Sequence, residues 1–118
     1  MIQDIQRNDN LFYLKISGQI TGKDVNYAVP IIEKAMKEHK NIKFLVVLSD
    51  FTGYTFGGFI QDFLFYFKYM HIFKYIAVVG NNDKYKKFIE NFNKYFPCNA
   101  RYFDESKLAD AQDWINQI

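Results

Sequence analysis

The chain has 118 residues, of which 49% are hydrophobic and 24% are charged. This composition suits one packed domain over residues 1–118 and excludes an intrinsically disordered protein. The net charge of +2 is too small to indicate a nucleic-acid-binding protein, and the single cysteine, Cys98, excludes an internal disulfide framework. Because no secretion signal and no uncharged apolar run of about 18 residues is recognisable, we expect a cytoplasmic protein.

The N-terminal residues predict an antiparallel hairpin. Ile2–Ile5 and Leu11–Ile16 are strand candidates, and the second alternates apolar and polar residues. The turn residues Asn8-Asp9-Asn10 lie between them, as a hairpin requires.

A helix and a buried strand follow the hairpin. Thr21 and Asp24 have the spacing of a capping box. Apolar residues then repeat at helical spacing: Val25, Val29, Ile32 and Met36. Pro30 falls inside this repeat, so it either kinks the helix or marks its first turn. The run FLVVL at Phe44–Leu48 is typical of a strand buried on both faces, as in a parallel sheet.

The second half of the chain alternates helices and strands. After a turn at residues 49–53, we expect a second helix over about residues 55–69 and a buried strand at Tyr75–Val79. A third helix has one apolar face: Tyr85, Phe88, Ile89, Phe92 and Phe96. Ala100–Phe103 is a short last strand, and Ser106 is expected to cap a closing helix that Trp114 packs on the sheet. This order predicts an α/β fold with a mostly parallel sheet covered by helices.

Five segments carry a resemblance to a known family. They are the Gly18–Thr21–Asp24 start of the first helix, Leu45–Thr55 (LVVLSDFTGYT), Asp62–Lys68, Ile76–Gly80 (IAVVG) and Arg101–Ile115. In this order they resemble the SpoIIAA-like proteins, relatives of the STAS domains. The resemblance implies a mixed, mostly parallel five-stranded sheet with an N-terminal antiparallel hairpin and about four helices. It also implies a non-catalytic binding or interaction module.

An aromatic cluster predicts a site for an apolar small molecule or a lipid-like chain. Ligands of open α/β sheets favour the carboxyl ends of parallel strands, and the segment 49–54 follows such an end. The expected lining residues lie in this segment and at the start of the second helix: Phe51, Tyr54, Phe56, Phe59 and Phe63. The alternative is a turn held by Asp50 and Gly53, with the aromatic rings filling the end of the sheet.

Thr55 is a candidate phosphoacceptor on the strength of the resemblance. STAS domains of the anti-sigma-factor-antagonist type carry a phosphorylatable Ser at the start of their second helix, directly after an Asp. Thr55 occupies the position that looks equivalent, but Tyr54 precedes it. The alternative role of Thr55 is a helix N-cap.

Phe65 and Tyr69 fall toward the polar side when the second helix is placed on a helical wheel. Exposure of two such rings to water costs roughly 1.5–3 kcal/mol each, so we expect something to cover them. A second copy of the chain, an apolar ligand, a membrane surface and a neighbouring loop are the candidates.

Charge is uneven along the chain. Seven basic and two acidic residues lie from Lys68 to Arg101, whereas residues 102–118 contain four acids and one lysine. The basic third helix is either an ordinary solvated face or a surface for an acidic partner or an anionic membrane.

Three functions follow, in order of support: a binding module for an apolar ligand, a regulatory interaction module switched at Thr55, and an enzyme. The enzyme is last because no base and nucleophile can be assigned together. No cofactor or metal is expected, since His71 has no ligand partner at helical spacing and Gly57-Gly58 lacks the lysine of a phosphate loop.

Overall fold

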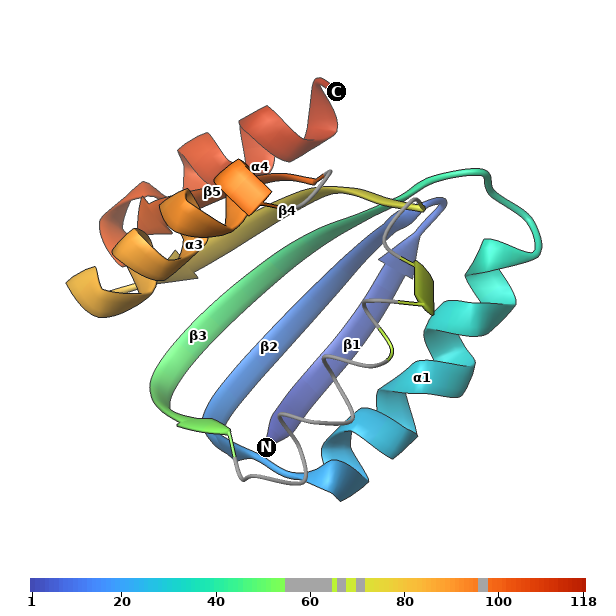
Figure 1. The fold of residues 1–118 in the computed structure, drawn as a ribbon, viewed down its shortest axis with the longest axis horizontal. Helices are drawn as coiled ribbons and strands as arrows, with labels where there is room; N and C mark the ends of the chain where they lie inside the picture. The colour runs from blue at the N-terminus through green and yellow to red at the C-terminus, as the bar shows by residue number, and fades with distance from the viewer. Residues whose placement is uncertain (55–64, 66–67, 70–71, 96–97) are drawn as a thin grey trace.

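A computed structural model describes residues 1–54, 65, 68–69, 72–95 and 98–118, with only the backbone of Tyr54, Lys84, Phe92 and Tyr95 (Figure 1). The strands are β1 (Ile2–Asn8), β2 (Leu11–Ile20), β3 (Ile42–Tyr54), β4 (Phe73–Gly80) and β5 (Asn99–Asp104). The helices are α1 (Gly22–Met36), α3 (Asp83–Tyr95), the short 3-10 helix η1 (Glu105–Lys107) and α4 (Leu108–Asn116). Phe65, Lys68 and Tyr69 are also helical, within the expected second helix.

The five strands form one sheet in the order β1-β2-β3-β4-β5. β1 pairs with β2 in antiparallel fashion, and the other pairs are parallel, which confirms the predicted hairpin and mixed sheet. Asp9 takes a positive φ of 59° in the hairpin turn, a conformation that Asp and Asn adopt more readily than most residues. β1 and β2 extend beyond their predicted ends, because backbone pairing continues through the polar residues Gln6–Asn8 and Ser17–Gln19.

The two faces of the sheet carry separate apolar clusters. On one face, α1 packs over β2 and β3 with a cluster of Phe12, Leu14, Ala28, Ile32, Ala35, Ile42, Phe44 and Phe73. On the other face, α4 packs over β3 and β4 with a cluster of Leu45, Ala77, Val79, Ala111 and Ile115. Figure 1 shows α1 and α4 on opposite sides of the sheet. Alternate residues of β3 therefore serve both clusters, as the continuous apolar run predicted.

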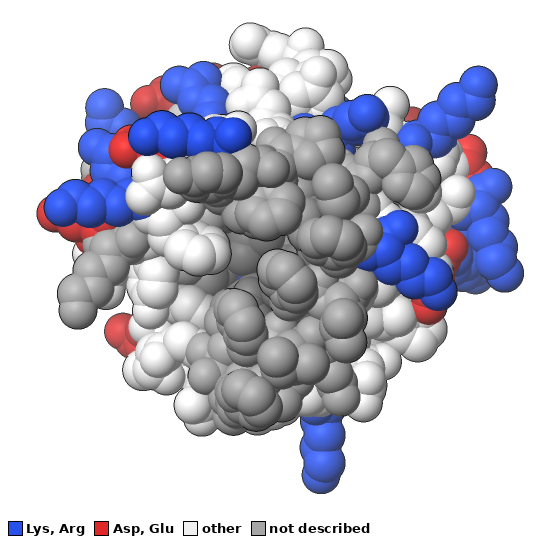
Figure 2. Space-filling model, in the orientation of Figure 1, with Lys and Arg blue, Asp and Glu red and all other residues white. Residues whose placement is uncertain are grey.

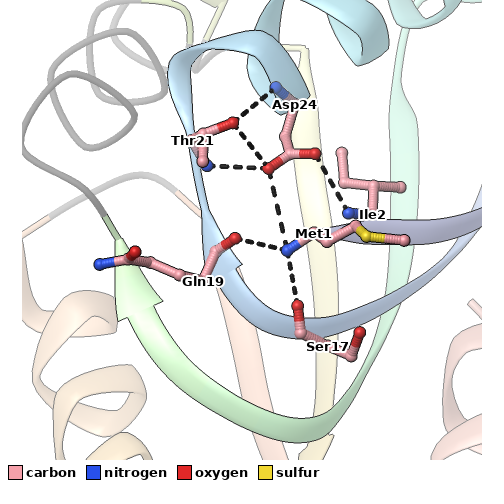
Figure 3. A network of polar contacts seen from close by, with 6 residues as sticks. All are labelled: Met1, Ile2, Ser17, Gln19, Thr21 and Asp24. Carbon is pink, nitrogen blue, oxygen red and sulfur yellow. Dashed lines mark hydrogen bonds and ion pairs between the residues drawn. The ribbon is translucent and has the colours of Figure 1, made fainter.

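A polar network joins the start of α1 to β1 (Figure 3). The Asp24 N–H donates to Thr21 Oγ1 at 3.3 Å and the Thr21 N–H donates to Asp24 Oδ2 at 2.8 Å, which confirms the predicted capping box. The Ile2 N–H donates to Asp24 Oδ1 at 3.3 Å, and the Met1 ammonium donates to the carbonyls of Ser17 and Gln19 and lies 3.8 Å from Asp24. Burial acts to raise the pKa of Asp24, but the hydrogen bonds from Thr21 and Ile2 and the nearby ammonium lower it overall.

Pro30 lies inside α1, and the helix begins eight residues earlier at Gly22, so the proline does not mark the first turn. Its side chain is exposed, while Val25, Ala28, Ile32 and Ala35 form the buried stripe.

Two expectations about the C-terminal half are wrong. Ser106 does not cap the closing helix; Asp104 caps η1 instead, by accepting from the Ser106 N–H at 3.0 Å, and α4 begins only at Leu108. Phe88 does not face the core: it is 60% exposed. Ile89 of α3 is partly buried, and the Asn93 amide binds the backbone of β5.

Trp114 packs α4 on the sheet, as predicted, with its ring centroid 6.3 Å from that of Tyr75 and 6.0 Å from that of Phe103. The Arg101 guanidinium lies over the Trp114 ring at 5.3 Å. Lys43 Nζ donates to the Ile115 carbonyl at 3.0 Å, so a β3 side chain satisfies a carbonyl in the last turn of α4.

Candidate functional site

The segment 49–54, expected as a loop, is the last part of β3. Ser17 pairs with Ser49, Gly18 with Phe51 and Gln19 with Gly53, so β3 carries two extra residues, Asp50 and Thr52, against β2. Each extra residue is a β-bulge, and each bulge coincides with positive φ angles: 51° at Asp50, 112° at Gly53 and 59° at Gly18. Bulges turn side chains away from the regular alternation of a strand, and they recur next to active and binding sites.

Phe51 lies in the bulged end of β3, at the carboxyl edge of the sheet. Phe51 is partly buried and packs against the cluster of Ile16, Ile20 and Val25 beneath the start of α1. Its ring centroid lies 5.2 Å from that of Tyr85 in the first turn of α3. Two aromatic rings from distant parts of the chain therefore meet where the parallel strands end, which is the edge that ligands of α/β sheets favour.

Tyr102 fixes the turn next to Tyr85. Its hydroxyl oxygen accepts from the Asn82 N–H at 2.9 Å, which holds the start of α3 against the end of β5. Burial raises the pKa of Tyr102, and the nearby carboxylates of Asp104 and Asp83 raise it further, while the Asn82 N–H acts to lower it. The phenol therefore stays neutral at physiological pH and serves as a structural anchor. A Cβ at Gly80 would lie 3.0 Å from this hydroxyl, which explains the small residue at the end of β4.

Tyr85 and Tyr102 were not among the residues predicted for the site. The one available signal was that α3 starts directly after a parallel strand, so its first turn reaches the same edge as the end of β3. The pairing of Phe51 with Tyr85 depends on the bulges, which the residue pattern alone does not reveal.

Most of the predicted ligand-binding residues lie outside the described part of the chain. This holds for Phe56, Phe59 and Phe63, and Tyr54 is described only as the last residue of β3, paired with Ile20. The predicted phosphoacceptor Thr55 also lies outside, so the choice between phosphoacceptor and N-cap stays a prediction. The described residues form two hollows, of about 370 and 480 Å³, on the outer side of α3 and at the end of α1.

Phe65 and Tyr69, which the helical wheel placed toward the polar side and which were expected to be covered, are partly covered by other residues of the chain. Both are partly buried against the cluster beneath α1, and their ring centroids lie 5.5 Å and 6.3 Å from that of Phe73. The Tyr69 hydroxyl donates to Glu33 Oε2 of α1 at 2.9 Å. A wheel gives the direction of a side chain but not the neighbours that tertiary packing brings to it. Self-association through Phe65 and Tyr69 stays a prediction.

Two other groups with displaced pKa values have structural partners. Glu38 has a lowered pKa because the Arg7 guanidinium binds it, and Asp104 has a lowered pKa because the Ser106 hydroxyl and N–H donate to it.

Within the described ranges, no group of three or more His, Cys, Asp or Glu side chains is arranged to hold a metal ion. None of the helices in the described part of the chain is long and apolar enough to cross a membrane.

Comparison with known proteins identifies the family. The sequence model of the SpoIIAA-like family matches residues 11–116. An uncharacterised protein of the DUF3478 family from Shewanella loihica PV-4, whose crystal structure is described as having a SpoIIAA-like fold, superposes with a TM-score of 0.80. The two sequences are 23% identical over 98% of this chain and 92% of that chain. No curated protein matches the sequence. Because the family match spans most of the chain and the structural likeness spans nearly all of it, the chain belongs to the SpoIIAA-like family.

Proposed function

We propose that this protein is a non-catalytic binding module that takes an uncharged apolar molecule, such as a lipid-like chain, at the bulged end of β3. SpoIIAA-like proteins are in general non-catalytic, and their fold is that of a binding or interaction module. The observation that carries the proposal is that two successive bulges in β3 place the Phe51 ring in contact with the Tyr85 ring.

The backbone at this end of β3 supports a specialised role. A positive φ at a residue other than glycine costs of order 1 kcal/mol and persists where the surrounding structure holds it in place. Asp50, at 51°, is such a residue, and the chain keeps it in a strand that could have ended at Leu48 or Ser49. The result is an aromatic side chain directed at the edge where ligands enter α/β sheets.

The chemistry of the described residues favours an apolar ligand. Phe51 and Tyr85 offer ring faces, and the hydroxyl oxygen of Tyr102 already accepts a hydrogen bond from the Asn82 N–H. The cluster behind Phe51, made of Ile16, Ile20 and Val25, is apolar. The predicted contribution of Phe56, Phe59 and Phe63 from the following segment adds further aromatic surface.

The test is a fluorescence titration with N-phenyl-1-naphthylamine, an uncharged apolar probe that brightens on leaving water. We expect saturable binding to the wild-type chain, and a loss of at least about tenfold in affinity in Phe51→Ala, since an aromatic ring contributes about 1.5–3 kcal/mol when buried. The matched control is Tyr27→Ala, which removes a 63% exposed ring from α1 and should leave the affinity unchanged.

Phe51→Leu separates binding from folding. This variant keeps apolar volume against the Ile16 cluster but loses the ring contact with Tyr85, so it should fold like the wild type and bind the probe more weakly. Equal affinities for wild type, Phe51→Ala and Phe51→Leu, or the absence of saturable binding, would show that this end of β3 is not a ligand site.

A further inference from the structure

A second surface, which shares α3 with the proposed ligand site, lies at the end of the sheet formed by β5. There α3 packs against β5, and η1 and α4 follow β5 directly (Figure 1). Phe88 of α3 is 60% exposed, although an apolar residue of this size is ordinarily withdrawn from water.

The two elements at this end carry opposite charge. Over Asp83–Tyr95, α3 contains four lysines and two acids, a net charge of +2, and Lys86, Lys87 and Lys94 are exposed. Over residues 105–113, η1 and the first part of α4 contain three acids and one lysine, a net charge of −2, and Glu105, Asp110 and Asp113 are exposed. In the view of Figure 2, blue and red side chains both stand out at the upper left, where Figure 1 places α3 and α4.

Among the described side chains, these opposite charges form no ion pair with one another. Among the described residues, ion pairs join Asp24 to the Met1 ammonium, Arg7 to Glu38 and His39 to Asp9, all in the N-terminal half. No pair in the described part of the chain joins a lysine of α3 to an acid of η1 or α4. Each monomer therefore presents both halves of a complementary contact at one end.

A side chain of α3 covers part of the outer edge of β5. The Asn93 amide donates from Nδ2 to the Ala100 carbonyl at 2.5 Å, and its Oδ1 accepts from the Ala100 N–H at 2.7 Å. A side chain of α3 thus occupies the backbone groups that a further strand would need at Ala100. Strand pairing is therefore blocked at Ala100, and the proposed contact is made by the helices.

We propose that two copies of this chain associate about a two-fold axis, with α3 of each copy docked on η1 and α4 of the other. Two-fold symmetry makes the contact twice, so each pairing of lysines with Asp110 and Asp113 is repeated and both copies of Phe88 leave water. Charge complementarity selects a second copy as the partner, because the acidic surface that fits α3 is present on the same chain.

The association should be weak and sensitive to salt, because exposed ion pairs contribute little individually and are screened by ions. Sedimentation velocity across a protein concentration series is the measurement. We expect a monomer–dimer equilibrium at about 20 mM NaCl and a shift of at least about tenfold toward monomer at about 500 mM NaCl, where the Debye length is only a few ångströms.

Charge reversal tests the pairing itself. Variant one carries Lys86→Glu and Lys87→Glu, and variant two carries Asp110→Lys and Asp113→Lys; all four side chains are exposed, so both should fold. Each variant alone should be monomeric, since it opposes like charges. An equimolar mixture should form dimers again, because α3 of variant one then meets α4 of variant two and the reverse contact is also complementary. Lys23→Glu, at an exposed site on α1, is the control and should dimerise like the wild type.

Three results would overturn the proposal. They are a wild-type chain that stays monomeric at low salt, dimers that survive both reversals, and a mixture that fails to dimerise. If the monomeric wild type instead pelleted with phosphatidylglycerol vesicles and variant one did not, the partner of α3 would be an anionic membrane. Phe51 is not part of this surface, although its ring contacts Tyr85 in the first turn of α3. Phe51→Leu, which should fold like the wild type, should therefore dimerise normally while binding the probe more weakly, so failure of one proposal is distinguishable from failure of the other.

Discussion

Replacing Asn93 should destabilise the protein by exposing the outer edge of β5. Asn93 makes two hydrogen bonds to the backbone of Ala100, a residue that is only 2% exposed. Each such bond contributes about 0.5–1.5 kcal/mol, and water can reach this edge to replace part of the loss. We therefore expect Asn93→Ala to lower the free energy of unfolding by about 2 kcal/mol, which lowers Tm by roughly 6–10 °C in a domain of this size.

Asn93→Asp should lower the free energy of unfolding more than Asn93→Ala does at neutral pH, and part of this loss should be recovered in acid. The carboxylate can still accept from the Ala100 N–H, but its second oxygen would face the Ala100 carbonyl oxygen across the 2.5 Å now spanned by an N–H donor. We expect a loss of about 3 kcal/mol at pH 7. The protonated carboxyl can donate to that carbonyl, so folding raises the pKa of the introduced group. The stability it restores is present below the unfolded pKa of about 3.9 and is lost as the pH rises through the raised folded pKa.

The assay is urea denaturation, followed by circular dichroism at a series of pH values and compared with the wild type at each pH. Asn91→Asp is the matched control, because Asn91 is an exposed residue on the same helix. The reasoning would be refuted if Asn93→Asp cost no more than Asn91→Asp at pH 7, or if its deficit relative to wild type did not shrink toward pH 4.

Two further substitutions test the polar contacts that join the elements. Asp24→Asn should cost about 1–2 kcal/mol at pH 7, because it weakens the cap of α1 and the link to Ile2. Folding lowers the pKa of Asp24, so the stabilisation by its carboxylate is present above the unfolded pKa and is lost as the pH falls through the folded pKa. Urea titrations should therefore show the difference in unfolding free energy between wild type and Asp24→Asn disappearing below about pH 4. A difference that grew in acid would contradict this reasoning. Lys43→Met should remove the donor to the Ile115 carbonyl and speed amide hydrogen exchange in the last turn of α4 by about tenfold while leaving β2 unchanged. Uniform acceleration throughout the chain, or none, would show that Lys43 does not hold α4.

Three of the features predicted correctly from the sequence follow from local patterns. The Thr21–Asp24 cap depends on two residues three positions apart, and the β1–β2 hairpin depends on a turn cluster between two short apolar patterns. The run at Phe44–Leu48 indicated a strand with two buried faces, and β3 does serve both clusters. In each case the residue pattern that predicts the structure lies within one short segment.

The errors occur where tertiary contacts override a local pattern. The sequence Ser49-Asp50-Phe51-Thr52-Gly53 has turn composition, but pairing with β2 keeps it in the sheet and places the turn-forming residues in bulges. Phe88 follows the helical repeat of apolar residues, yet its ring is 60% exposed in the folded protein, where Asn93 of the same helix binds the backbone of Ala100. The meeting of Phe51 with Tyr85 is of the same kind, since the two residues are brought together only by the folded sheet.

The most direct test of the account is a two-dimensional amide NMR titration of the wild-type chain with dodecan-1-ol, an uncharged lipid-like chain. The account predicts that the largest shifts cluster at residues 50–53 of β3 and at Asn82–Tyr85 at the start of α3, and that Phe51→Ala reduces them. It predicts small shifts at the hollow formed by Met36–Lys40 and Ile72, at the far end of α1. Shifts centred on that hollow or on α4, or no saturable shifts at all, would contradict a binding site at the bulged end of β3.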